Sequence, residues 1–164
     1  MSSTQPRKTL WQAQNGAQLT VSNQTLANLT FFKSINWFGK VSSPGYPAII
    51  HPNASGLFSH LRNTNDKSMA AVIYSGTNQS MQLCAWILAW CAPAKSIEGN
   101  KIYVFCGPQS LIESMTDDQI RVSLESSFEN SNATDTAAKI SANATINDTV
   151  PTMATVGANF SLIP

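Results

Sequence analysis

The sequence predicts an all-β fold: an antiparallel β-sandwich with one short helix in the C-terminal third. Residues 9–32, 41–61 and 68–94 contain no Asp, Glu, Lys or Arg. Helices in water-soluble proteins usually carry charges on the solvent face, whereas neutral stretches of Thr, Val, Ile and aromatic residues cut by Gly, Pro and Asn are typical of strands and turns. An apolar run at residues 83–92 supplies a candidate for the central strand.

The length of 164 residues predicts a single domain, residues 1–164. Apolar residues make up 43% of the chain, enough for a core that hides roughly 70% of the surface of the unfolded chain. Residues 1–9 lack the apolar stretch of a secretory signal, so we expect a flexible N-terminus and a cytoplasmic protein.

The charge balance excludes a strongly basic surface. Ten Lys and Arg face nine Asp and Glu, a net charge of +1, so nucleic acid is not a predicted partner. Ser, Thr and Asn supply 48 residues and predict a polar but nearly neutral exterior. The longest apolar run has ten residues, about half of what a helix needs to span a bilayer, so the chain is not predicted to be transmembrane.

The first half of the chain reads as a series of strands and turns. Residues 17–21 alternate apolar and polar side chains, as a half-buried strand does. Pro44 and Gly45 predict a turn in residues 42–47. Further strands are predicted at residues 26–32, 35–41, 57–61 and 69–74.

The run at residues 83–92 is the most informative segment. In an extended conformation, one face carries mostly large side chains: Cys84, Trp86, Leu88 and Trp90. The other face carries mostly small ones: Ala85, Ile87, Ala89 and Cys91. A strand that is apolar on both faces belongs in the middle of a sheet covered on both sides. A ten-residue helix is the alternative interpretation.

The remaining third mixes a helix with strands. Residues 101–106 predict a strand, and Thr116 with Gln119 predicts the capping box of a helix. Apolar residues also alternate at Ile120, Val122 and Leu124, so a strand is the alternative interpretation of this segment. Residues 129–150 are rich in Asn, Ala and Thr and predict a mobile loop, and residues 152–163 predict a closing strand.

Catalytic and metal signatures are weak. The odd number of cysteines (Cys84, Cys91 and Cys106) predicts reduced, buried thiols rather than a zinc site with His51 or His60. A hydrolase would need His60 or His51 paired with Cys84 or Asp66, and no recognised nucleophile motif surrounds them. We therefore expect no enzyme activity, no metal and no cofactor.

Several short elements resemble the plant jasmonate-induced proteins. They are Asn36-Trp37-x-Gly39, Tyr46-Pro47, Gly56-Leu-Phe-Ser-His60, Met69-Ala-Ala-Val-Ile-Tyr74 and Cys84-Ala-Trp-Ile-Leu-Ala-Trp90, within residues 21–93. The resemblance implies a leaf protein made under jasmonate, salt or wound stress, and it transfers no catalytic residue. The all-β pattern of that family is similar to the aegerolysin and actinoporin-like sandwiches, which bind membrane lipids.

These observations favour a non-enzymatic stress or defence protein that binds a lipid headgroup or a carbohydrate. Aromatic rings stack on sugars or lie at membrane interfaces, while Asn and His supply hydrogen bonds. The predicted ligand-binding residues are Asn36, Trp37, Tyr46, His51 and His60. The alternatives are that Trp37 is a core residue and both histidines are ordinary loop or edge residues, or that the protein is a structural or storage protein that forms homo-oligomers without a small ligand.

Overall fold

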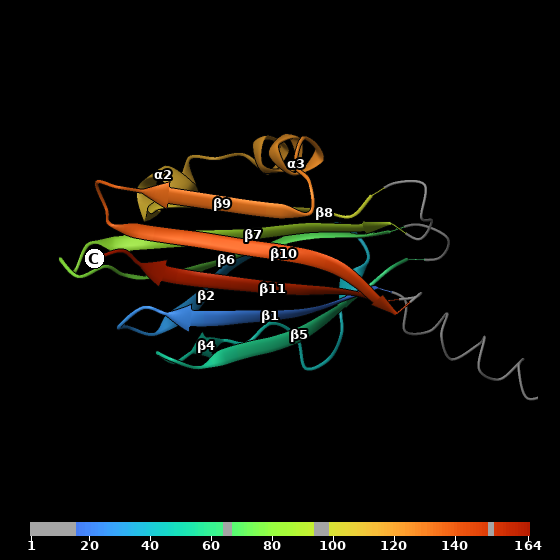
Figure 1. Cartoon of the computed structure of the whole chain (residues 1–164), viewed down its shortest axis with the longest axis horizontal. Coiled ribbons are helices and arrows are strands. Elements are labelled where there is room, and N and C mark those ends of the chain that lie inside the picture. The colour runs from blue at the N-terminus through green and yellow to red at the C-terminus, as the bar shows by residue number, and fades with distance from the viewer. Residues whose placement is uncertain (1–15, 64–66, 94–98, 151–152) are drawn as a thin grey trace, which may run out of the picture.

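Two β-sheets pack face to face, and two short helices cover the outer face of one of them (Figure 1). The computed structural model describes residues 16–63, 67–93, 99–150 and 153–164. The sandwich class is confirmed, and its strand pairs are antiparallel except for one parallel pair, β1 with β11. The predicted flexible segment at residues 1–9 lies outside the described residues.

One sheet has five strands in the order β4-β2-β6-β7-β8. Their bounds are β2 (Leu29–Phe38), β4 (Ile49–Ile50), β6 (Lys67–Thr77), β7 (Leu83–Pro93) and β8 (Lys101–Pro108). The other sheet has six strands in the order β3-β5-β1-β11-β10-β9. Their bounds are β1 (Gly16–Gln24), β3 (Lys40–Val41), β5 (Ser55–Leu61), β9 (Asn130–Asp135), β10 (Ile140–Val150) and β11 (Met153–Leu162).

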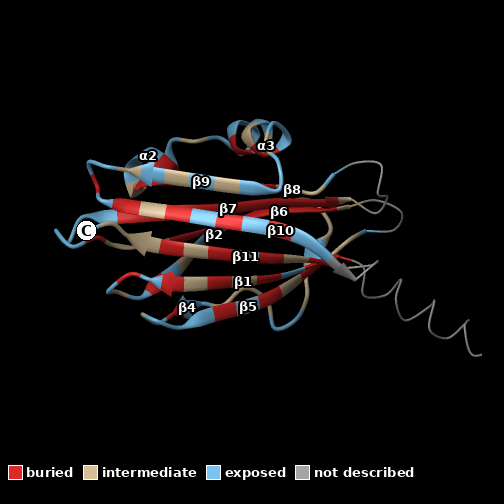
Figure 2. Ribbon diagram, viewed as in Figure 1, coloured by how far each residue is buried: buried red, intermediate tan, exposed pale blue. Residues whose placement is uncertain are grey.

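Strand β7 is the extended, doubly covered strand that its sequence predicts, and it lies between β6 and β8. Its large side chains, including Trp86 and Trp90, lie in the core between the two sheets. Its small side chains, including Ala85 and Ala89, lie in a second core beneath the helices. Figure 2 shows the buried residues running along β6 and β7.

The predicted helix is confirmed as α3 (Asp117–Glu125), with Thr116 as its N-cap. Its apolar stripe buries Ile120 and Leu124 against the five-stranded sheet. A second helix, α2 (Gln109–Glu113), was not predicted, because five residues with one buried side chain, Ile112, produce no periodic signal.

The predicted loop at residues 129–150 was wrong. The segment forms β9 and β10, and β10 pairs with β11 along its length. Two of the four apolar residues that β10 points into the core are alanines; the four are Ile140, Ala142, Ala144 and Ile146. Alanine is depleted in strands generally, so composition concealed the two-residue period.

The strands predicted at residues 26–32 and 35–41 are joined differently from the prediction. One long strand, β2, covers most of both, and the short strand β3 follows it in the other sheet. The pairing of β2 with β6 shifts register between Phe31 and Lys33 and again between Asn36 and Phe38. The second irregularity brings Phe38 to the same face as Ile35 and Trp37, beneath the helices.

Candidate functional site

Asn36, Tyr46 and His60 come together from three separate segments. Asn36 lies on β2, His60 lies on β5 of the opposite sheet, and Tyr46 lies between β3 and β4. His60 Nε2 lies 2.9 Å from Asn36 Oδ1, and the Tyr46 hydroxyl donates to the same oxygen at 3.3 Å. This polar cluster therefore bridges the two sheets.

The cluster continues into the core through Ser68 and Trp90. His60 Nδ1 lies 2.8 Å from Ser68 Oγ, and Trp90 Nε1 donates to that hydroxyl oxygen at 3.0 Å. Because Asn36 Oδ1 accepts, His60 Nε2 carries the hydrogen, and the Ser68 hydroxyl donates to Nδ1. The imidazole is therefore neutral, and both of its nitrogens are hydrogen-bonded.

Burial sets the protonation states of this cluster. His60 has no exposed surface, and desolvation lowers its pKa from 6.5 to about 4. Desolvation raises the pKa of Tyr46 to about 12. At neutral pH both groups are uncharged, so the cluster is suited to hydrogen bonding of neutral groups through the exposed Asn36.

Trp37 does not join the cluster. It lies on the other face of β2 and packs, partly buried, against the core beneath the helices, together with Phe38. Asn36 faces the opposite side, where it meets His60. Trp37 therefore does not line a common site with Asn36, Tyr46 and His60.

His51 lies at the other end of β2. Its Nδ1 is 3.0 Å from Asn28 Oδ1, and both side chains are exposed. Asn28 and Asn36 are eight residues apart, roughly 25 Å along an extended strand. The predicted residues therefore occupy opposite ends of the sandwich.

The end that holds His51 includes three loops without charge, here called the neutral end: residues 25–28, 51–54 and 78–82 (Figure 1). The β9–β10 turn, with the exposed Lys139, lies beside the last of these loops, since the Asn78 side chain donates to Ala138 O. Hydrogen bonds join the first two loop regions, since the Asn23 side chain donates to Ile50 O and Asn53 N donates to Asn23 O. None of the three loops contains a charged residue.

Large apolar side chains project from the neutral end. Leu26 is 76% exposed, Met81 is 78% exposed, and Leu83 at the start of β7 is 51% exposed. Met81 has a backbone φ of +64°, in the left-handed region. The buried Asn78 holds this turn, because its Oδ1 accepts from the backbone N–H groups of Ser80 and Gln82. Sequence reasoning missed this feature, although the long uncharged segments were its signal.

The three cysteines are buried residues of the two cores. Cys84 and Cys106 are buried between the sheets, and all three cysteines are free of disulfides. Burial, and secondarily the charge of Asp135, raises the pKa of Cys106 to about 12 and also raises that of Cys84. Asp66 lies outside the described residues. Within the described ranges, no group of three His, Cys, Asp or Glu side chains could hold a metal ion. Nor does any described helix have the length and hydrophobicity to cross a bilayer.

Comparison with solved structures identifies a similar sandwich. The lipid-binding protein Nakanori superimposes with a TM-score of 0.75 at 14% identity, over 97% of this chain and 79% of that chain. The Xerocomus chrysenteron lectin XCL reaches a TM-score of 0.46 at 9% identity, over 88% of this chain and 99% of its own, which is too low to establish a shared fold.

Comparison of sequences identifies a relative. No protein-family model matches the chain. A jasmonate-induced protein homolog of Atriplex canescens is 37% identical over 153 residues, which cover 92% of this chain and 82% of that protein. The match extends well beyond the short elements noted in the sequence and includes most of the C-terminal third. The chain therefore belongs to the jasmonate-induced protein family.

Proposed function

We propose that this protein is a non-enzymatic stress-associated protein that binds the headgroup region of an uncharged or zwitterionic membrane lipid through its neutral end. The observation that carries the proposal is the exposure of Leu26 and Met81 in loops without charge and of Leu83 at the adjoining start of β7. Grouped apolar side chains on an otherwise polar surface indicate an interaction site. A cytoplasmic location would present this end to membranes facing the cytosol.

The energy available from these side chains is sufficient for shallow insertion. Transfer of one exposed Leu or Met side chain out of water contributes about 1.5–3 kcal/mol when burial is complete. Three such side chains inserted together contribute several kcal/mol, which offsets the loss of translational freedom at a membrane surface. The exposed His51 and Asn28 beside them offer hydrogen bonds to headgroup oxygens.

The conformation of Met81 supports a role other than folding. A non-glycine residue in the left-handed region costs about 1–2 kcal/mol, and Asn or Gly tolerates that region better. The Met81 side chain gains little stabilisation from packing, because most of its surface is exposed to solvent. An apolar residue at this position is thus unfavourable for the isolated fold and favourable at an apolar boundary.

The likeness to Nakanori supports the same proposal at the level of the fold, because that protein is described as lipid-binding. At 14% identity, no binding residue of Nakanori can be assigned to this chain. Family membership adds the link to stress.

Co-sedimentation with phosphatidylcholine vesicles tests the proposal. We expect the wild-type protein to sediment with vesicles, and Leu26→Ser and Met81→Asn each to reduce binding about tenfold, since each removes an apolar contact. Phe128→Ser is the matched control, because Phe128 is 79% exposed but lies beside Ile102 near the start of β8, at the end remote from the neutral end. Met81→Asn should also keep or raise the melting temperature.

Two results would overturn the proposal. Equal loss of binding in Phe128→Ser would show nonspecific adhesion. No binding to any vesicle would remove the lipid function, and a glycan panel then decides between the remaining classes. Glycan binding lost in Asn36→Ala would assign a carbohydrate to the cluster of Asn36, Tyr46 and His60, and absence of both activities would favour a structural or storage role.

A further inference from the structure

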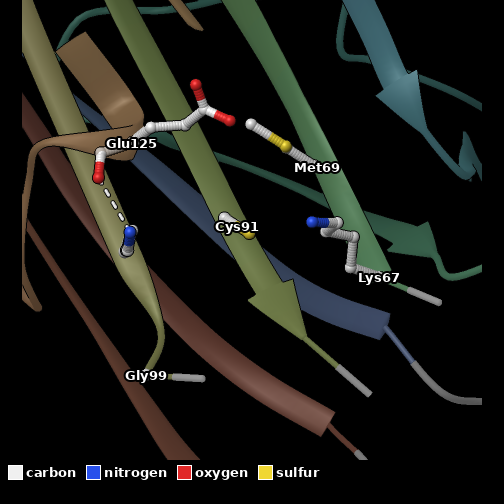
Figure 3. A pocket seen from close by; sticks show the side chains of 6 residues that line it. Lys67, Met69, Cys91, Gly99 and Glu125 are labelled. Atoms are coloured by element: carbon white, nitrogen blue, oxygen red, sulfur yellow. Dashed lines mark hydrogen bonds between the residues drawn. The ribbon is translucent and has the colours of Figure 1, made fainter. Parts of the chain in front are cut away.

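A pocket of about 420 Å³ opens on the outer face of the five-stranded sheet, beside the last turn of α3 (Figure 3). Met69, Cys91 and Lys101 line it from three adjacent strands, because Met69 pairs with Cys91 and Cys91 pairs with Lys101. Lys67 precedes Met69 by two residues on the same face of β6, and Glu125 comes from α3. The pocket thus joins buried sulfur-containing side chains to charged groups at its rim.

Most charges around the pocket have partners. Lys101 Nζ donates to the backbone oxygen of Glu125 at 2.7 Å, where the C-terminal end of the helix dipole favours a cation. The Glu125 carboxylate lies 3.5 Å from Arg121 Nε. These contacts leave both the carboxylate and Lys101 largely compensated.

Lys67 differs from the other cations. Its Nζ lies 4.9 Å from the centroid of the Phe38 ring, and no carboxylate among the described residues forms an ion pair with it. Figure 3 shows its ammonium group pointing toward Cys91. Within the described residues, Lys67 therefore lies beside a mainly apolar floor without an anionic partner.

We propose that this pocket binds an amphipathic monoanion, a carboxylate attached to a short apolar chain or ring. The carboxylate would pair with Lys67, and the apolar part would lie on Met69 and Cys91. The Glu125 carboxylate at the rim disfavours a dianion such as a phosphate monoester, because like charges repel at short range. The volume falls within the range of small-molecule sites. The proposal is independent of lipid binding, since the length of β6 separates this pocket from the neutral end.

Isotope-labelled methionine methyl groups provide a separate reporter for each surface. Met69 reports this pocket, Met81 reports the neutral end, and Met115 reports the open apolar groove that it lines with Tyr103 and Val122. Each resonance is assigned by a Met→Leu substitution. The probes are hexanoate, hexanol as its uncharged counterpart, and acetate as the headgroup alone, each titrated into the full chain near neutral pH.

We expect hexanoate to shift the Met69 resonance saturably, with hexanol and acetate about tenfold weaker. Lys67→Met keeps the length of the side chain and removes its charge, so it should weaken hexanoate about tenfold, as loss of a hydrogen bond to a charged group does. Lys40→Met, on β3 of the other sheet, should leave affinity unchanged.

Three outcomes would overturn the proposal: equal affinity for hexanol and hexanoate, an unchanged affinity in Lys67→Met, or movement of the Met115 resonance without that of Met69. Unchanged positions of the other methyl resonances in Lys67→Met show that the variant is folded. A protein that fails to bind vesicles can still pass this test, and one that binds vesicles can fail it.

Discussion

His60 is a histidine used as a neutral bridge in the core. It joins the two sheets through Asn36 and Ser68, and its ring meets the Trp90 ring edge-on at 5.3 Å between centroids. Each polar atom that burial removes from water is matched by a partner, which avoids the cost of an unsatisfied buried group. The residue therefore contributes to the fold through an arrangement that only the neutral imidazole satisfies.

This arrangement predicts a loss of stability in acid. The pKa of His60 is about 4 in the folded protein and near 6.5 in the unfolded chain, so the unfolded state takes up the proton first as the pH falls. Stability is unaffected above the unfolded pKa and decreases from pH 6.5 to about pH 4, by about 3 kcal/mol when the whole shift is realised. Urea unfolding across this pH range measures the effect.

His60→Gln separates this contribution from the titration of carboxylates. The variant should be less stable than the wild type at neutral pH, with a shallower decline toward pH 4. His51→Gln, at an exposed position, should decline as the wild type does. Parallel pH profiles for wild type and His60→Gln would contradict the assignment.

At the scale of elements, helix α3 is stabilised at its N-terminus by a capping box. The Thr116 hydroxyl accepts from Gln119 N at 3.1 Å, and Gln119 Oε1 accepts from Thr116 N at 2.8 Å. Lys33 on β2 contacts Asp117 at 2.8 Å, an exposed ion pair of the kind that contributes little. The capping box and the burial of Ile120 and Leu124 therefore hold the helix on the sheet.

Removing the N-cap of α3 should lower the stability of the protein by a measurable amount. Thr116→Ala leaves the first helical N–H groups without an acceptor and should cost about 1 kcal/mol, a fall of about 2–4 °C in melting temperature. Thr116→Ser keeps the hydroxyl and should lie close to the wild type. Thermal unfolding of both variants tests this, and equal destabilisation would show that loss of the methyl group, rather than of the cap, is responsible.

The sequence was informative about elements whose signal is local. The alternation of large and small residues in β7 predicted both of its faces, and the Thr116–Gln119 spacing predicted the start of α3. Strand β10 escaped prediction because two of its four inward apolar residues are alanines, whose small size is explained by large neighbours such as Trp86 in the same core.

The candidate site could be predicted only in part, because its contacts join segments distant in sequence. Asn36 and His60 were predicted as ligand-binding residues, but the contact between them crosses from one sheet to the other. Alternation along β2 places Trp37, like Ile35, toward the helices, and the register shift after Asn36 brings Phe38 to that face as well, an irregularity that no sequence pattern marks. Met81 was not singled out, because its exposure depends on the turn that Asn78 builds.

At the scale of the whole molecule, the last strand completes the sheet that the first described strand begins. Strand β11 lies between β1 and β10, and its register with β1 is continuous from Gly16 with Met153 to Gln24 with Ser161. Phe160 of β11 stacks on Trp86 at 6.1 Å between centroids, which ties this closure to the opposite sheet. The neutral end is thus supported by both halves of the chain.

Charge is distributed unequally along the long axis. Lys67 and Lys101 lie at the ends of β6 and β8 that are remote from the neutral end, and β6 alone extends roughly 33 Å from Lys67 to Thr77. Exposed charges separated by more than a Debye length, about 10 Å at moderate salt, act almost independently. The charges of Lys67 and Lys101 therefore exert little electrostatic force on a membrane that touches the neutral end.

This separation predicts vesicle binding that depends only weakly on salt. If the neutral end makes the contact, raising the salt concentration or adding anionic lipid to phosphatidylcholine vesicles should change binding no more than about fivefold, because the three loops carry no charge and the neighbouring Lys139 contributes at most about 1 kcal/mol. If the end that holds Lys67 and Lys101 made the contact instead, each Lys near the membrane surface would contribute about 1 kcal/mol with anionic lipid, and salt would weaken binding steeply. Co-sedimentation across a salt series, with Lys67→Met combined with Lys101→Met as the control variant, distinguishes the two orientations. Unchanged binding in that variant supports contact through the neutral end, and a marked loss would reverse the orientation.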